Sequence, residues 1–263
     1  MKPSYWQIQT KDKPLFPELE WSRPENKLHA GKLLIIGGNA HGFAAPAGAF
    51  GYAEKAGAGT MRVILPDAVR KIVGAILPEA NYAPSTPSGS FAQKALGEVL
   101  AASSWADGVL VAGDLGRNSE TAILLESLLA KYSGQITLVK EAIDYATSAP
   151  HTTLNRENTL LVLTMAQLQR LGTAARMPTP IKFSMDLLHL VEWLHNFTTH
   201  FKPYIVVKHL DNLVAAVNGE ISSTKLANPL DTWRIKTAAE ASVWWLQHPN
   251  KPFESITVSL QHI

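Results

Sequence analysis

The fold is decided by GGNAHGFAAPAGAFGYAEKAGAGTMRVILP, residues 37–66. The apolar run KLLIIG at 32–37 leads into it and predicts a buried strand of a parallel sheet. Small residues over 47–58 then predict a helix, and Pro46 suits its first turn. TMRVILP at 60–66 predicts the next strand. The stretch is therefore one strand–loop–helix–strand unit of an α/β sheet.

The same alternation continues along the chain. Further strands are predicted at 108–113, 135–139, 159–163 and 204–208. Helices are predicted over 67–76, 91–102, 118–131 and 231–247. Asn118 is expected to cap the helix that runs through Lys131. Asn218-Gly219 predicts a β-hairpin over 212–224, and the proline-rich stretch 78–89 is expected to be a loop.

This order of elements predicts the fold class and the domain organisation. Alternating strands and helices indicate a three-layer α/β/α architecture, with a mostly parallel central sheet and helices on both faces. Residues 26–263 are expected to form this single domain, and residues 1–25 a solvated N-terminal arm. The arm's apolar residues are expected to dock it on the body or on a neighbouring subunit; they are Trp6, Leu15, Phe16 and Trp21.

Composition excludes several classes of function. The chain has no cysteine, so disulfides, thiolate catalysis and cysteine metal sites are excluded. Its net charge is only +2 and its basic residues do not cluster, so no nucleic-acid partner is expected.

His189, His195 and His200 would point in different directions on one helix, so no metal site is expected. Without a signal or membrane-spanning run, we expect a cytoplasmic protein. Charged residues make up only 17% of the chain, which favours a homo-oligomer.

The opening stretch has a specific set of glycines and prolines. Gly37-Gly38 closes the first strand, Ala45-Pro46 opens the small-residue helix, and Gly57-Ala58-Gly59 ends it. In these features it resembles the first unit of the ADP/ATP-dependent NAD(P)H-hydrate dehydratases, which have the ribokinase-like fold. Weaker similarities follow in the same order at VLVAGDLGRN (109–118) and IVVKHLDNLVAAVNGE (205–220). The resemblance is specific in the first third of the chain and thin after residue 120.

The resemblance implies a reaction and a set of ligands. Members of this family use ATP or ADP with Mg²⁺ to phosphorylate the hydroxyl of hydrated NADH or NADPH, and then eliminate phosphate. That chemistry needs backbone amides around the transferred phosphate and an aspartate as base. The positions of this chain that the resemblance implicates in nucleotide or substrate binding are Gly37, Gly38, Asn39, Gly113, Asp114, Gly116, Lys208 and Asn228.

The catalytic loop departs from the family's pattern. Asn228-Pro229 is present, but an ungapped pairing places Trp233, Arg234, Ile235 and Lys236 where the glycines and the aspartate belong. If the loop is shortened instead, Asp231 takes the catalytic place. No glycine follows Gly219 in either register, and an amide cradle is hard to build without one.

Other site positions depart as well. Val139-Lys140-Glu141 stands where the family has Asp-Ala-Asp, and His209 replaces the glycine after the strand lysine. Asp231 also has a plain interpretation as a helix N-cap, and Gly37-Gly38 as a tight turn. Asp114 and Lys208 have an equally plain one as solvated residues.

Three functional hypotheses follow. The first is a divergent NAD(P)H-hydrate dehydratase-like protein that binds nucleotide or dinucleotide with reduced or no catalysis, a pseudoenzyme. The second is an active dehydratase or small-molecule kinase that uses Asp231, or Lys236 in the ungapped register. The third is a non-catalytic structural or regulatory partner protein.

Overall fold

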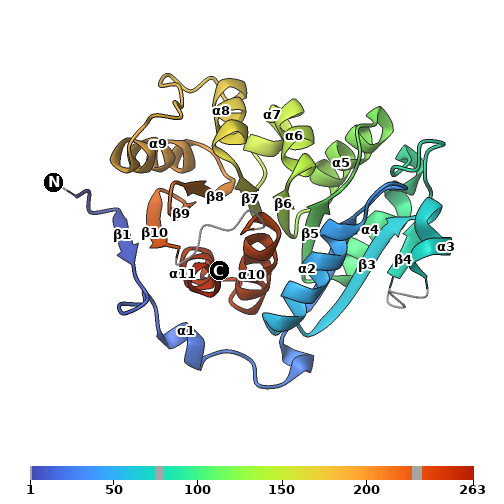
Figure 1. Ribbon diagram of the computed structural model, residues 1–263, viewed down its shortest axis with the longest axis horizontal. Coiled ribbons are helices and arrows are strands. Elements are labelled where there is room, and N and C mark those ends of the chain that lie inside the picture. The colour runs from blue at the N-terminus through green and yellow to red at the C-terminus, as the bar shows by residue number, and fades with distance from the viewer. Residues whose placement is uncertain (1, 75–79, 227–232) are drawn as a thin grey trace.

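The computed structural model describes residues 2–74, 80–226 and 233–263, and it forms one ten-stranded sheet with helices on both faces (Figure 1). The strands are β1 (Trp6–Gln9), β2 (Lys32–Gly37), β3 (Thr60–Pro66), β4 (Ala80–Ala83), β5 (Gly108–Gly113), β6 (Gln135–Val139), β7 (Thr159–Leu163), β8 (Tyr204–His209), β9 (Asn212–Val217) and β10 (Glu220–Lys225). The helices are α1 (Glu18–Trp21), α2 (Ala44–Lys55), α3 (Arg70–Val73), α4 (Leu96–Trp105), α5 (Ser119–Lys131), α6 (Glu141–Ser148), α7 (Pro150–Leu154), α8 (Met165–Ala174), α9 (Leu187–His200), α10 (Trp233–Gln247) and α11 (Pro252–Ser259).

The sheet is mostly parallel, as predicted. Its strand order is β1-β10-β9-β8-β7-β6-β5-β2-β3-β4, and only the pairs β8–β9 and β9–β10 are antiparallel. The chain begins the parallel part at β2, runs outward through β3 and β4, and then returns to the other side of β2 to lay down β5. The strand order therefore reverses between β2 and β5. Open α/β sheets bind their ligands at such a switch point, beyond the carboxyl ends of the strands.

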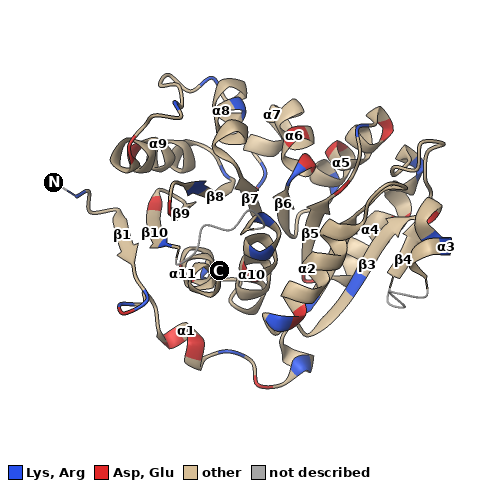
Figure 2. Ribbon diagram, in the orientation of Figure 1, with Lys and Arg blue, Asp and Glu red and all other residues tan. Residues whose placement is uncertain are grey.

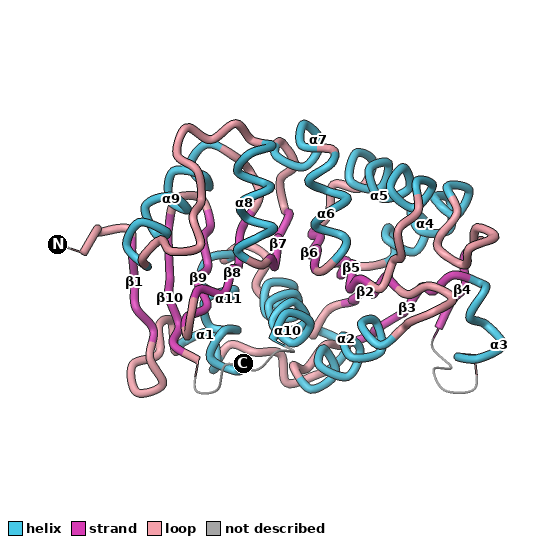
Figure 3. Tube along the Cα trace, turned by 45° about the horizontal axis from the view of Figure 1, so that its top comes forward, coloured by secondary structure: helices cyan, strands magenta, loops and turns pink. Residues whose placement is uncertain are grey.

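Two apolar cores lie on the two faces of the sheet. One packs alternate strand residues against α4, α5, α6, α8 and α9, and the other packs the opposite residues against α2, α10 and α11. Figure 3 shows these helices in separate layers, with the sheet between them. Trp244 and Trp245 in α10 are buried, as expected for core or interface residues. The three-layer α/β/α prediction is confirmed.

Local expectations were mostly confirmed, but the proline-rich stretch differs from its prediction. The Asn118 side chain accepts a hydrogen bond from Glu120 N and caps α5, and Asn218-Gly219 turns the hairpin with positive φ at both residues. The stretch 78–89 is not wholly a loop, because Ala80–Ala83 forms edge strand β4 beside β3. Its prolines lie outside the four paired residues, so they leave this ladder intact.

The N-terminal segment is docked on the body rather than solvated throughout. Residues of β1 pair in parallel with β10, and the Trp6 indole donates to the Ser223 hydroxyl at 3.0 Å. The Gln9 side chain is buried and donates to Thr224 and to the Thr257 carbonyl. Trp21 is 89% exposed and does not take part in this docking. Among the described helices, none is long and apolar enough to cross a membrane.

Candidate ligand site at the sheet switch point

Glycines bring the carboxyl ends of β2 and β5 into close contact. Gly38 N donates to Gly113 O at 3.0 Å, and a Cβ at Gly37 would lie only 2.6 Å from the same oxygen. Gly38 and Gly113 have φ values of 85° and 101°, which side-chain-bearing residues rarely adopt. The packing of the chain on itself therefore accounts for these glycines without a ligand. Ligand contact at Gly37 and Gly38 stays a prediction.

Asp114 lies at the centre of this crossing, directly after β5. Its Oδ2 accepts from Ala45 N in the first turn of α2 at 2.7 Å, and its Oδ1 pairs with the Lys140 ammonium. Its own amide donates to Glu141 Oε2 at 2.9 Å. The carboxylate thus serves as a cap for α2 from another element, and it occupies the place where an anion would meet the positive end of that helix.

Lys140 joins β6 to α6 in a strained backbone conformation. Its φ is 56° and its ψ is −128°, a region that favours glycine. The Gln167 side chain donates to its carbonyl at 2.8 Å and holds it in place. The side chain is only partly exposed, at 23%. The strained backbone of Lys140 therefore places a cation just beyond the carboxyl end of β6, beside the end of β5.

Two cavities flank the Asp114–Lys140 pair. The larger, about 510 Å³, opens beyond β2, β5 and β6; it is lined by Asn39, His41, Gly42, Asp114, Gly116, Arg117, Glu141, Asp144 and Tyr145. The smaller, about 300 Å³, lies between α2, the end of β6 and the start of α10; it is lined by Ala44, Ala45, Gly48, Tyr52, Lys140, Arg234 and Ile235. The switch point thus combines space with both signs of charge.

The loops around the larger cavity are held by hydrogen bonds of their own. The Asn39 amide donates to Asp114 O, and its Oδ1 accepts from His41 N at 2.7 Å. The Tyr145 hydroxyl donates to Gly116 O at 2.6 Å and accepts from Asn118 N at 3.0 Å. The walls are therefore largely pre-formed, which lowers the entropic cost of binding.

The described residues do not fit a dedicated Mg²⁺ site. No group of three or more metal-ligating side chains occurs in the described ranges. The nearby carboxylates already have partners: Asp114 pairs with Lys140, and Asp144 with Arg170 at 2.7 Å. Figure 2 shows acidic and basic residues interspersed in the elements around this edge of the sheet. The cations and the space suit an anionic small molecule better than a bare divalent ion.

The sequence-predicted site residues are only partly brought together. Asn39, Asp114 and Gly116 line the larger cavity, and Gly37, Gly38 and Gly113 form the crossing beside it. Lys208 lies on β8, three strands from β5, and lines neither cavity. Asn228 and Asp231 lie outside the described residues.

The start of α10 carries the residues that replace the family's glycine loop. The Trp233 side chain is buried at 8% exposure, and Ile235 reaches the smaller cavity. The Lys236 ammonium donates to the Ile263 carbonyl at 3.1 Å and does not line either cavity. Bulky side chains thus occupy the wall that faces α2.

Sequence reasoning missed the two cations of the smaller cavity as binding residues. Lys140 and Arg234 were noticed only as departures from a family pattern. The position of Lys140 directly after a predicted strand, next to the strand that ends just before Asp114, was the available signal. Arg234 carried no such signal, because its approach to α2 depends on how α10 packs.

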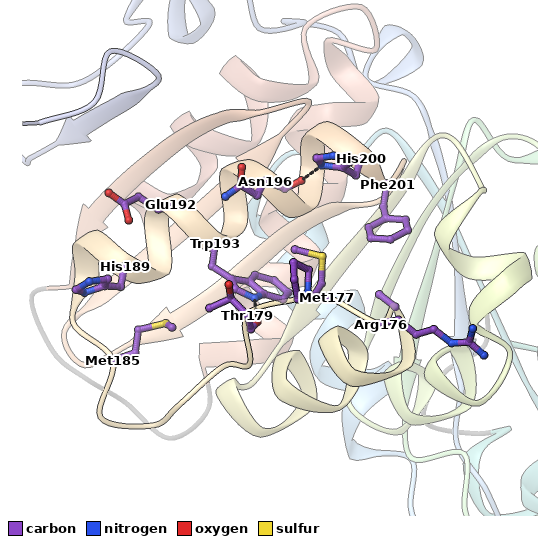
Figure 4. Close-up of a pocket in the computed structure, with 12 residues that line it drawn as sticks. Arg176, Met177, Thr179, Met185, His189, Glu192, Trp193, Asn196, His200 and Phe201 are labelled. Carbon is purple, nitrogen blue, oxygen red and sulfur yellow. Dashed lines mark hydrogen bonds between the residues drawn. The ribbon is translucent and has the colours of Figure 1, made fainter.

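A third cavity, about 540 Å³, lies away from the switch point, between α9 and the segment that precedes it (Figure 4). His189, Glu192, Asn196 and His200 follow one another along the exposed side of α9. Trp193 closes the floor and donates to Thr179 O at 2.7 Å. No strand end opens into it, so we favour the switch-point cavities as the functional site despite its size.

Comparison with known proteins supports the fold and leaves the family open. No protein-family model and no curated protein matches the chain. A ribokinase-like superfamily protein from Enterococcus faecalis aligns with 99% of this chain and 86% of its own, with a TM-score of 0.74 and 19% identity. An ADP/ATP-dependent NAD(P)H-hydrate dehydratase from Bacillus subtilis, co-crystallised with ATP/Mg²⁺ and soaked with CoA, covers 92% and 84%, with a TM-score of 0.61 and 13% identity. An ADP complex of pyridoxal kinase from Bacillus subtilis covers 88% of each chain, with a TM-score of 0.53 and 8% identity.

The fold and these likenesses define the class of protein. The chain has the ribokinase-like α/β fold, with a mostly parallel ten-stranded sheet. It is structurally similar to an NAD(P)H-hydrate dehydratase, and structural relatives bind ATP with Mg²⁺.

Proposed function

We propose that this chain is a divergent NAD(P)H-hydrate dehydratase-like protein that binds a nucleotide or dinucleotide at the switch point and has lost most or all turnover. The observation that carries this proposal is a contrast between two parts of the site. A pre-formed cavity lies beside β2 and β5, whereas the sequence that leads into α10 contains no glycine after Gly219. Nucleotide binding by structural relatives supports the ligand class.

Binding is supported by the location and the chemistry of the cavities. The switch point is where open α/β sheets hold ligands, and both cavities reach it. Polar residues of the Asn39 and Gly116 loops, among them His41 and Arg117, line the larger one. Lys140 and Arg234 give the smaller one a positive charge that suits phosphates.

Loss of turnover is supported by the absence of a glycine-rich loop in the sequence that leads into α10. Phosphoryl transfer requires main-chain donors gathered around the phosphate. The first turn of α10 instead carries Trp233 and Ile235, and no glycine follows Gly219. The carboxylate of Asp114 is held by Lys140 and by the amide of Ala45, so both of its oxygens already have partners.

Calorimetric titration tests retained binding. ATP, ADP, NADH and NADPH are titrated separately into the full chain, and at least one is expected to release heat with a saturable isotherm. Asp114→Asn is expected to weaken that binding because it removes the counter-charge that holds Lys140 beside the cavities. Silence toward all four ligands contradicts the proposal.

The active-enzyme alternative is favoured by one feature of the sequence. Asp231 stands two residues before Trp233, the first residue of α10, where a shortened loop would place a catalytic base. Repair of NADH hydrate in the presence of ATP or ADP is measured for the wild type and for Asp231→Asn. Activity that disappears in the variant establishes this alternative and removes the pseudoenzyme proposal.

A further inference from the structure

We infer that Lys140 and Arg234 form a side-chain anion site in the smaller cavity, and that it holds the phosphate group of a small ligand. The inference rests on the proposed function only for the rest of the ligand, because the site itself recognises a multiply charged anion. It replaces a cradle of amides by two cations, which can hold an anion without the donors that phosphoryl transfer needs.

The charge of the cavity points to an anion. Lys140 and Arg234 line it, whereas no carboxylate is among its described lining residues. Within the described ranges, Arg234 has no hydrogen bond or ion pair, and its side chain is half-buried. Lys140 is already paired with Asp114, so Arg234 is the cation that lacks a described counter-charge, and a guanidinium binds phosphate through two parallel N–H bonds.

Gly48 provides an independent sign that the space is kept for a ligand. It lies in the interior of α2, where glycine costs about 1 kcal/mol relative to alanine. A Cβ there would meet its nearest neighbours, Ile235 and Tyr52, at 3.8 and 3.9 Å, which are ordinary contacts. Neither backbone conformation nor packing therefore requires glycine. Its absent side chain leaves the cavity wall open opposite Arg234.

Asp114 explains why the anion would be held here rather than at the helix end. Its carboxylate already caps α2 through Ala45 N, so the positive end of that helix is occupied. Lys140 pairs with Asp114 from one side and faces the smaller cavity from the other. A ligand phosphate would share Lys140 with Asp114 while Arg234 closes over it. No bond is formed or broken in this step.

Titration with pyrophosphate at low ionic strength tests the site directly. Wild-type protein is expected to bind it, and Arg234→Met to bind about tenfold more weakly. Lys55→Met is the matched control, because Lys55 is an exposed cation at the opposite end of α2 and should leave binding unchanged. Lys140→Arg is expected to retain binding and Lys140→Met to lose it.

Gly48→Ala adds a test that does not remove a charge. It should raise thermal stability and weaken pyrophosphate binding, whereas Gly51→Ala should raise stability alone, because its added methyl would meet no described atom beyond its own helix backbone within 4 Å. Equal pyrophosphate affinity in wild type, Arg234→Met and Gly48→Ala overturns the inference.

Titration of the same variants with ADP and NADPH distinguishes a failure of this inference from a failure of the proposed function. Nucleotide binding that survives Arg234→Met and Lys140→Met unchanged overturns the anion site and leaves the proposed function standing. Pyrophosphate binding that depends on both cations, with no response to any nucleotide, supports the anion site and removes the proposed function.

Discussion

Two walls enclose the switch point: the crossing of β2 and β5, and the start of α10. The crossing keeps its glycines, whereas the sequence that leads into α10 has none after Gly219. At the crossing, an added Cβ at Gly37 or Gly113 would collide with neighbouring atoms, so the packing of the fold itself favours glycine there. At the start of α10, Trp233 and Ile235 pack without such a conflict. Glycines that the fold requires are therefore weak indicators of activity, and glycines that only a ligand requires are strong ones.

The largest expected effect comes from breaking the first wall. Gly37→Ala places a methyl 2.6 Å from the Gly113 carbonyl oxygen, and neither backbone can retreat without disturbing the β2–β5 pair. The free energy of unfolding is expected to fall by about 3 kcal/mol. Urea unfolding followed by circular dichroism measures it. An unchanged midpoint would show that the crossing is looser than this packing implies.

A smaller effect is expected from the ion pair between the walls. Asp114→Asn keeps a hydrogen-bond acceptor for Ala45 N but leaves Lys140 without its counter-charge. Because both side chains are partly exposed, the expected loss of stability is about 1–2 kcal/mol. Asp144→Asn, which breaks the more exposed pair with Arg170, is the control and should change stability less. Equal losses in both variants would count against a special role for Asp114.

Helix α10, whose start forms the second wall, contains a buried carboxylate that should respond to pH. Burial is the main cause that raises the pKa of Glu240 in α10, and the nearby cations His262, Lys236 and Arg23 oppose it only in part. The folded state thus favours the protonated form, whose contribution to stability is full below about pH 4.5 and is lost as pH rises through the folded pKa.

Glu240→Gln should therefore stabilise the protein at pH 7 by roughly 1 kcal/mol and make little difference at pH 4. Thermal melts of both proteins across this pH range measure the difference. A constant difference at all pH values would remove the role of the carboxylate charge.

The smallest effect sharpens the contrast between the two kinds of glycine. Gly48→Ala is expected to raise the free energy of unfolding by about 0.5–1 kcal/mol, because alanine suits a helix interior and its methyl has room. Gly37→Ala is expected to lower the free energy of unfolding, so the two substitutions should change stability in opposite directions. Chemical denaturation resolves both, and a destabilised Gly48→Ala would show that its neighbours cannot accept the methyl.

The sequence predicted the elements that have a clear local pattern and missed those that depend on distant pairing. Buried strands such as 108–113 are continuous apolar runs, so their bounds matched. Strand β4 was missed because it is a short edge strand in a proline-rich stretch, and β1 because its partner β10 lies more than two hundred residues away. Local pattern cannot encode a pairing of that range.

The site was predicted less completely than the fold. Asp114 and Asn39 were named through the family resemblance, in loops that follow predicted strands, and both line the larger cavity. The role of Lys140 requires the knowledge that β6 lies beside β5, and that of Arg234 requires the packing of α10 on α2. Lys208 was named by resemblance alone, and its strand lies apart from both cavities.

The pairing of β1 with β10 also has a consequence for how the protein is made. Trp6 meets Ser223 across a separation of 217 residues, so a ribosome must release all of the intervening polypeptide before this ladder can close. Until residues 220–225 have emerged, the segment around Trp6 has no strand to pair with. Residues 6–9 are thus synthesised long before their partner, and the nascent chain can misassociate through this unpaired segment in the meantime.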